Sequence, residues 1–276
     1  MNEVELDIEA KELARLLHLP EKSAWERHRL SILRHIEQGD IKADFLRWST
    51  VQATMFVGDV PYVRSELREI LSDTNVSRWI KAMTDSHFGN PDRFEEDRRF
   101  TGSSIHQAYH LRVWERASGQ RIEDLHNIVE FGGGYGQMCA IAHRLGFHGN
   151  YTLFDFPEFL MLQRFYLENI GLPQDTLDLI SYRQVDSEDR FQYPPSSTDL
   201  LIGCYSLCEA PAELRRIFFD VVSPKSCLIA THDSWDGADM HKYFDTFMRQ
   251  RSDQYVWHKR DNKNIPGHFY VVGVKK

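Results

Sequence analysis

The stretch that most constrains the fold lies at residues 127–137, where a short apolar run meets a glycine-rich turn. It reads NIVEFGGGYGQ, with Glu130 near the end of the apolar run and Gly132, Gly134 and Gly136 at alternating positions after it. Glycines at a strand-to-helix turn let backbone N–H groups approach a ligand closely, where a Cβ would clash. The pattern therefore predicts a strand, a ligand-binding turn and a helix in succession.

Two classes of ligand use a turn of this kind: dinucleotides and the sulfonium nucleoside S-adenosylmethionine. The dinucleotide fingerprint needs another glycine three residues after Gly134, and that position holds Gln137. A carboxylate at Glu130 suits the ammonium group of a methionine moiety and does little for a pyrophosphate. By these residues the chain resembles the class I S-adenosylmethionine-dependent methyltransferases. The cofactor contacts expected from the turn are Glu130, Gly132, Gly133, Gly134, Tyr135 and Gly136.

A second apolar run, residues 151–155, ends in a carboxylate and continues into Phe156 and Pro157. In this arrangement Asp155 can accept hydrogen bonds from both ribose hydroxyls, and Phe156 can cover one face of the purine. Pro157 suits the first turn of the next helix. Asp155 can instead be a simple helix N-cap, but its occurrence together with Glu130 and the glycines favours the ribose role. S-adenosyl-L-methionine is therefore the expected cofactor.

The composition limits the partners and the compartment. The chain has 276 residues, of which 42% are hydrophobic and 12% aromatic, enough for a large packed core. A formal charge of −8 without a basic tract argues against nucleic acid as a partner. The acidic N-terminus lacks the apolar region of a secretory signal, and no apolar run reaches membrane-spanning length. Four cysteines without paired spacing are typical of reduced thiols, so we expect a cytoplasmic protein without a membrane partner.

The order of predicted elements indicates the fold class. Residues 1–120 are expected to be mostly helical, with helices at 8–17, 23–38, 45–55, 62–71 and 104–118. From about residue 125, strands at 127–131, 151–155, 177–182, 199–205 and 226–232 alternate with helices at 138–145, 157–170, 211–221 and 237–250, which predicts a parallel sheet covered on both faces. Two last strands, 254–259 and 268–275, form a hairpin. The prediction is a Rossmann-like α/β methyltransferase sandwich of seven strands (121–276), with a helical extension (1–120) that contributes to the acceptor site.

Ligands of such sheets bind at the carboxyl ends of the strands, which places further candidates. Asp186 and Ser187 follow the third strand and suit the adenine amino group, although Asp186 is equally well explained as a solvated turn residue. Tyr205 follows the fourth strand and is predicted to contact the cofactor.

An alcohol acceptor needs a base to take its proton. His232, with Asp233 beside it, ends the fifth strand, and Glu209 follows the fourth strand, where helix capping before Pro211 explains it equally well. His106 and His110, at i and i+4, can approach from the extension. No carboxylate cluster or His-Glu-x-x-His pattern is present, so we expect no metal.

Beyond the class, the chain resembles the bacterial sugar O-methyltransferases. The resemblance spans roughly residues 44–240 and rests on three segments: 44–55, the glycine turn running on through 154–158 to 163–167, and 205–211. It implies a polyhydroxylated acceptor and an extension that packs over the carboxyl edge of the sheet. Thr101 and Gly102 would then touch the cofactor, although a helix N-cap explains this segment as well. Arg98 and Arg99 can hold a phosphate of a sugar nucleotide, or belong to a solvated, salt-bridged face.

The predicted function is transfer of a methyl group to a hydroxyl of a sugar or glycosylated small molecule. One alternative is a nitrogen or carboxylate acceptor on another metabolite, and another is a non-catalytic scaffold that only binds the cofactor. A nicotinamide dehydrogenase is disfavoured by Glu130 and Gln137. The helical extension can also offer an apolar surface for a homodimer.

Overall fold

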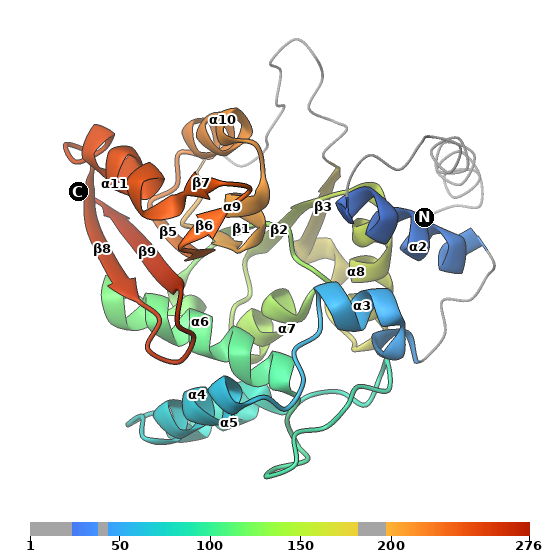
Figure 1. The fold of residues 1–276 in the computed structure, drawn as a ribbon. Helices are drawn as coiled ribbons and strands as arrows, with labels where there is room; N and C mark the ends of the chain where they lie inside the picture. Colours follow the sequence, from blue (N-terminus) through green and yellow to red (C-terminus); the bar gives the residue numbers. More distant parts are fainter. Residues whose placement is uncertain (1–23, 38–43, 182–196) are drawn as a thin grey trace.

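The computed structural model describes residues 24–37, 44–181 and 197–276, and its centre is a seven-stranded sheet (Figure 1). The strands lie in the order β3-β2-β1-β4-β5-β9-β8; their bounds are β1 Asn127–Phe131, β2 Asn150–Asp155, β3 Leu177–Ser181, β4 Leu200–Cys204, β5 Ser226–His232, β8 Tyr255–Asp261 and β9 His268–Lys275. Strands β1 to β5 are parallel, and β9 runs antiparallel between β5 and β8. This topology confirms the predicted seven-stranded, Rossmann-like α/β sandwich with a helical N-terminal region.

Side chains alternate between the two faces of the sheet, as strand geometry requires. Ile128 of β1 packs into one core and its neighbour Val129 into the other. Helices on opposite sides cover the two faces (Figure 1). The first face carries α6 (Gly102–Ser118), α7 (Gln137–Arg144) and α8 (Pro157–Asn169), and the second carries α10 (Ala212–Val222) and α11 (Met240–Gln250).

The helical extension shares the first of these cores with the sheet. Its elements are α2 (Ala24–Glu37), η1 (Phe45–Arg47), α3 (Ser49–Thr54), α4 (Pro61–Leu71), α5 (Val76–Met83) and α6. Trp79 of α5 and Trp114 of α6 lie in one hydrophobic cluster with Leu228 of β5. The core therefore continues across residue 120. The predicted helix at 8–17 lies outside the described residues.

Helix α6 has well-defined ends. Thr101 and Ser104 form a reciprocal capping box at its start, and Gly119 ends it in the left-handed conformation. The helix is buried along most of its length because α4 and α7 pack against it and β5 and β9 also contact it. It is the main connection between the extension and the sheet.

Two predicted helices have other bounds: the helix expected at 45–55 is interrupted at Trp48, whose backbone is extended, and the helix expected at 237–250 begins only at Met240. Residues before it form a two-stranded hairpin, β6 (Ser234–Trp235) and β7 (Ala238–Asp239). Asp236 and Gly237, at the turn, both have positive φ, 48° and 76°, as the tight hairpin turn requires. The remaining short helices are η2 (Ile122–Asp124), η3 (Gln174–Thr176) and α9 (Ser206–Glu209).

In the part of the chain that the structure describes, no helix is both long and apolar enough to cross a bilayer. All four cysteines are free, and Cys139, Cys208 and Cys227 are buried.

Candidate active site

A cavity of about 560 Å³ lies over the carboxyl ends of β1, β2, β4 and β5. The strand order reverses between β1 and β4, and crevices at such a point are where open α/β sheets bind ligands. The predicted residues that line the cavity are Glu130, Gly132, Gly133, Gly134, Tyr135, Asp155, Phe156, Tyr205, Glu209 and His232. The helical extension adds Met55, Phe56, Tyr62 and His106, and the β8–β9 loop region adds Ile265 and His268.

The glycine turn has the close backbone approaches that its sequence predicts. Gly132 has φ 74°, and its N–H donates to the Phe154 carbonyl at 2.8 Å. A Cβ at this position would clash with the Cβ of Ser206, which follows β4. Gly134 has φ 59° and faces the cavity, where a Cβ would come no closer than 3.7 Å to Met55. Gly136 lies behind them at the start of α7, and it does not line the cavity.

Glu130 is a buried carboxyl group on the cavity wall. Its side chain accepts a hydrogen bond from the Tyr151 hydroxyl at 2.8 Å. Burial raises the pKa of Glu130 to about 8, and the nearby Asp155 charge adds to the rise. Among the described residues no lysine or arginine forms an ion pair with it. The site thus holds a desolvated acid for which a bound cation would be a favourable partner.

Asp155 ends β2 on the same cavity wall and is also buried. It accepts hydrogen bonds from the Phe156 N–H at 2.8 Å and from Gln163 Nε2 at 2.7 Å. Burial raises the pKa of Asp155 to about 7. The N-cap of α8 is Phe156, without a side-chain cap bond, so the capping role does not account for Asp155.

Gln163 was not among the sequence candidates, although it connects two of them. Its Nε2 also donates to the Gly134 carbonyl at 3.0 Å, so one buried amide on α8 contacts both the glycine turn and Asp155. Its Oε1 is buried and has no hydrogen-bond partner among the described residues. A glutamine within a helix gives no sequence signal of such a role.

Phe156 is covered on one side by the helical extension. The guanidinium of Arg29, on α2, lies 4.1 Å from the centre of the Phe156 ring. The same guanidinium pairs with Glu158, which is fully buried. Helix α2 is therefore held against the start of α8 at the edge of the cavity.

The structure brings together two of the predicted base candidates, His232 and Glu209. His232 Nε2 lies 3.8 Å from Glu209 Oε1, and both residues line the cavity. Asp233 instead has a half-exposed side chain that pairs with His241 at 2.9 Å, and it does not line the cavity. Consecutive side chains at the end of a strand point to opposite sides, which separates Asp233 from its neighbour.

His106 and His110 belong to a buried chain of hydrogen bonds. His106 Nδ1 lies 2.9 Å from Glu66 Oε2, and its Nε2 lies 3.1 Å from His110 Nε2. His110 Nδ1 in turn lies 2.9 Å from the Tyr270 hydroxyl on β9. Burial holds the pKa of His110 well below its usual value, so this ring is neutral. Both ring nitrogens of His106 are occupied, so this residue joins the extension to the sheet and has no lone pair for an acceptor.

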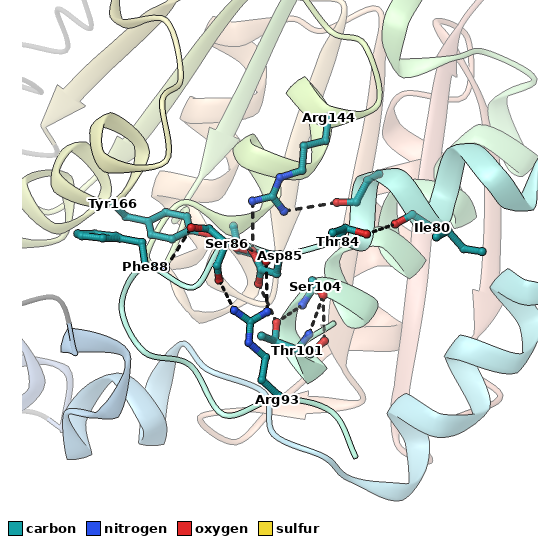
Figure 2. Close-up of polar contacts among 12 residues, drawn as sticks. Ile80, Thr84, Asp85, Ser86, Phe88, Arg93, Thr101, Ser104, Arg144 and Tyr166 are labelled. Carbon is teal, nitrogen blue, oxygen red and sulfur yellow. Dashed lines mark hydrogen bonds and ion pairs between the residues drawn. The ribbon is translucent and has the colours of Figure 1, made fainter. Parts of the chain in front are cut away.

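A second buried cluster surrounds Asp85, which lies in the loop between α5 and α6 (Figure 2). Its carboxylate accepts hydrogen bonds from Thr101 Oγ1 at 2.9 Å, Gln137 Nε2 at 3.1 Å and Arg144 Nη2 at 3.1 Å. The Ser86 N–H at 2.9 Å and the Tyr166 hydroxyl at 3.3 Å complete the set. Gln137 is the first residue of α7 and directly follows Gly136 of the glycine turn. Its hydrogen bond to Asp85 therefore holds the end of this turn in place. An isolated acid between helices gave no sequence signal.

Thr101 belongs to the cluster around Asp85, and neither Thr101 nor the adjacent Gly102 lines the cavity. Thr101 is fully buried and bonds Asp85 and the Ser104 N–H. A Cβ on Gly102 would clash with the carbonyl oxygens of Gly58 and Val57. The capping explanation accounts for the contacts of this segment, and direct contact with a cofactor stays a prediction.

Several other candidates lie away from the cavity or outside the described residues. Asp186 and Ser187 fall outside them. Arg99 pairs with its neighbour Asp97 on the surface, and neither Arg98 nor Arg99 lines the cavity. Within the described ranges, no group of three or more His, Cys, Asp or Glu side chains is placed to hold a metal ion.

No protein-family model and no curated protein sequence matches this chain. Among solved structures, it is similar to the methyltransferase domain of a bacterial Hen1 (14% identity, TM-score 0.45, covering 61% of this chain and 97% of that one). It is also similar to the mitomycin 7-O-methyltransferase MmcR (13% identity, TM-score 0.44, covering 96% and 75%) and to the S-adenosylmethionine-dependent methyltransferase SibL (12% identity, TM-score 0.41, covering 96% and 74%). These similarities say nothing about the acceptor.

Proposed function

We propose that the protein is an S-adenosylmethionine-dependent methyltransferase that transfers a methyl group to a hydroxyl of a sugar or glycosylated small molecule. One observation carries the cofactor assignment. Two buried carboxyl groups, Glu130 and Asp155, lie at the ends of adjacent strands on either side of a glycine turn, within the methyltransferase strand order.

The residues present fit this cofactor. Glu130 is desolvated and has no lysine or arginine in the described structure to neutralise it, so the ammonium group of the methionine moiety would be a suitable partner. Asp155 has the two oxygens that a pair of ribose hydroxyls requires. Gly134 leaves room at the cavity wall for a ligand to approach the backbone.

The chain's own residues supply the acid–base chemistry. When bound, the cofactor would supply an electrophilic methyl group on a positively charged sulfur. We infer that His232 accepts the proton of the acceptor hydroxyl and that Glu209, whose Oε1 lies 3.8 Å from His232 Nε2, stabilises the imidazolium that results. The cavity walls exclude water and hold the two reactants together. His106 lines the cavity but is not proposed as the base, because Glu66 and His110 occupy its two ring nitrogens.

The ring side chains near the proposed base His232 are consistent with a ring-shaped acceptor. We call this part of the cavity the acceptor end. Tyr62, His106, Tyr205 and His268 all line this end of the cavity. Aromatic faces provide flat apolar surface, and their hydroxyl and nitrogen edges can bond hydroxyl groups. This combination suits the alternating C–H faces and hydroxyl edges of a sugar.

Calorimetric titration with S-adenosylhomocysteine tests the cofactor assignment. We expect micromolar binding to the wild type and at least a tenfold loss, about 1.4 kcal/mol, in Asp155→Ala. Asp233→Ala removes an exposed acid from the same edge of the sheet and should bind normally. Absence of binding to the wild type would contradict the proposal.

An acceptor screen with labelled donor then tests the direction of transfer. Label that survives mild alkali excludes a methyl ester, and mass spectrometry of the product separates an O-methyl from an N-methyl group. Cofactor binding without transfer to any acceptor tested would favour the scaffold alternative.

A further inference from the structure

Tyr205 has a backbone conformation that residues with a side chain rarely adopt. Its φ is 66° and its ψ is −51°, directly after β4. Such a conformation is costly and persists only where surrounding contacts hold it. The Tyr205 N–H donates to the Ala230 carbonyl at 2.8 Å, and its own carbonyl accepts from Cys208 Sγ at 2.8 Å and from the Glu209 N–H at 3.1 Å. Glycine could adopt this conformation without strain. Because a tyrosine stands here instead, we expect its side chain to have a role that offsets the cost of the backbone conformation.

The strained backbone directs the Tyr205 ring into the cavity beside the glycine turn. The next residue, Ser206, abuts Gly132 and donates a hydrogen bond to the Phe131 carbonyl, so Tyr205 lies across the switch point from Glu130. The Tyr205 hydroxyl lies 3.2 Å from His268 Nδ1, which fixes the tilt of the ring.

Aromatic rings and carboxyl groups surround the Tyr205 ring. The centre of the His232 ring lies 5.0 Å from that of Tyr205, and the centre of the His268 ring lies 5.4 Å away. The carboxyl groups of Glu130 and Glu209 line the same cavity. An aromatic face in such a setting attracts a cation more strongly than it attracts a neutral group of the same shape.

We propose that the Tyr205 ring recognises the positive charge on the sulfur of the methyl donor and thereby distinguishes the donor from its neutral product. The proposal rests on the proposed function. In the covalent structure of the donor, the sulfur lies between the amino group assigned to Glu130 and the ribose assigned to Asp155. Transfer of the methyl group leaves its bonding electron pair on sulfur, which becomes a neutral thioether. The attraction to the ring is then lost, and product release is favoured.

The test is calorimetric titration of three ligands: S-adenosylmethionine, S-adenosylhomocysteine and sinefungin, which carries a charged amine in place of the sulfonium. In Tyr205→Leu we expect about a fivefold loss of affinity for the two charged ligands (about 1 kcal/mol). The affinity for the neutral product should change by about twofold or less. Tyr205→Phe keeps the ring and should keep the preference. Tyr62→Leu, which removes another ring of the cavity wall, should leave the donor-to-product ratio unchanged.

Circular dichroism and thermal denaturation establish whether each variant is folded. If Tyr205→Leu is not, incorporation of a fluorinated tyrosine at position 205 keeps the shape of the ring and weakens its attraction for cations. An equal loss for all three ligands, or no loss, would overturn the proposal. Failure of all three ligands to bind the wild type would overturn the proposed function itself, which is a different result.

Discussion

Gln163 donates a hydrogen bond to Asp155 at 2.7 Å, so the acid at the end of β2 is held from a helix and not from its own strand. The same amide donates to the Gly134 carbonyl at 3.0 Å. One side chain therefore sets the position of the predicted ribose-binding acid relative to the glycine turn. Its Oε1 is buried and has no hydrogen-bond partner among the described residues.

Replacing this amide should weaken cofactor binding without altering any residue on the cavity wall. In Gln163→Leu we expect about a tenfold loss of affinity for S-adenosylhomocysteine (about 1.4 kcal/mol), because Asp155 loses the donor that orients it. Calorimetry measures the loss. Glu168→Leu, at an exposed position of the same helix, serves as the control. Unchanged affinity in Gln163→Leu would show that Asp155 is oriented by its other contacts.

Cofactor binding should strengthen as the pH rises from 6 to 8. The pKa of Glu130 is raised to about 8 by burial, so below that pH the free protein holds a proton on this group. An ammonium ligand needs the ionised carboxylate, so binding releases this proton, and the affinity falls by about tenfold for each pH unit below 8. Titrations of S-adenosylhomocysteine in buffers of different ionisation enthalpy count the protons released. In Glu130→Gln the overall affinity should be lower and its dependence on pH weaker; an unchanged dependence would assign the proton to another group.

His232 should contribute to transfer and not to cofactor binding. With an acceptor found in the labelled-donor screen, we expect His232→Ala to lower kcat by about 10²- to 10⁴-fold, the usual range for a general base. Glu209→Gln should lower it less, because the base remains and only its charge partner is lost. Asp233→Ala, whose carboxylate pairs with His241 on the surface, is the matched control. A large loss in Asp233→Ala with a small one in Glu209→Gln would reverse these roles.

Removal of the Asp85 carboxylate should destabilise the whole protein. Asp85→Ala leaves Arg144 without its partner in a buried site and removes the acceptor of Thr101 and Gln137. We expect a loss of about 3–5 kcal/mol in the free energy of unfolding, measured by urea denaturation. Glu213→Ala removes an acid from a surface pair with Arg216 and should change stability by about 0.5 kcal/mol or less. A comparably small effect at Asp85 would mean that water replaces its contacts.

The parts of the site that could be predicted are those that a short stretch of sequence determines. The glycine turn and Asp155 follow apolar runs of strand length, and parallel strands bring their carboxyl ends to one edge. His232 and Glu209 were placed on that edge for the same reason. Their pairing with each other was not foreseen, because Asp233 is adjacent in sequence but lies on the opposite side of the chain.

The rest depends on contacts between segments far apart in the chain. Asp85 and Gln163 are ordinary polar residues in sequence, and only tertiary packing makes them central. Tyr205 adopts a positive φ that side-chain-bearing residues avoid, so local preference points away from its true conformation. Residues 237–239 of the hairpin were predicted to be helical, although the Asp236-Gly237 pair is a strong turn signal.

The cluster around Asp85 also has an evolutionary consequence. A single carboxylate accepts from donors in the loop before α6, in α7 and in α8, so a change at Asp85 alone would leave buried donors in all three segments without this partner. In relatives with another cap over the same sheet, residues equivalent to Asp85, Thr101, Gln137, Arg144 and Tyr166 should therefore vary together as a set. A helical extension taken from another protein of this fold should therefore fit over the sheet only if this set is transferred with it.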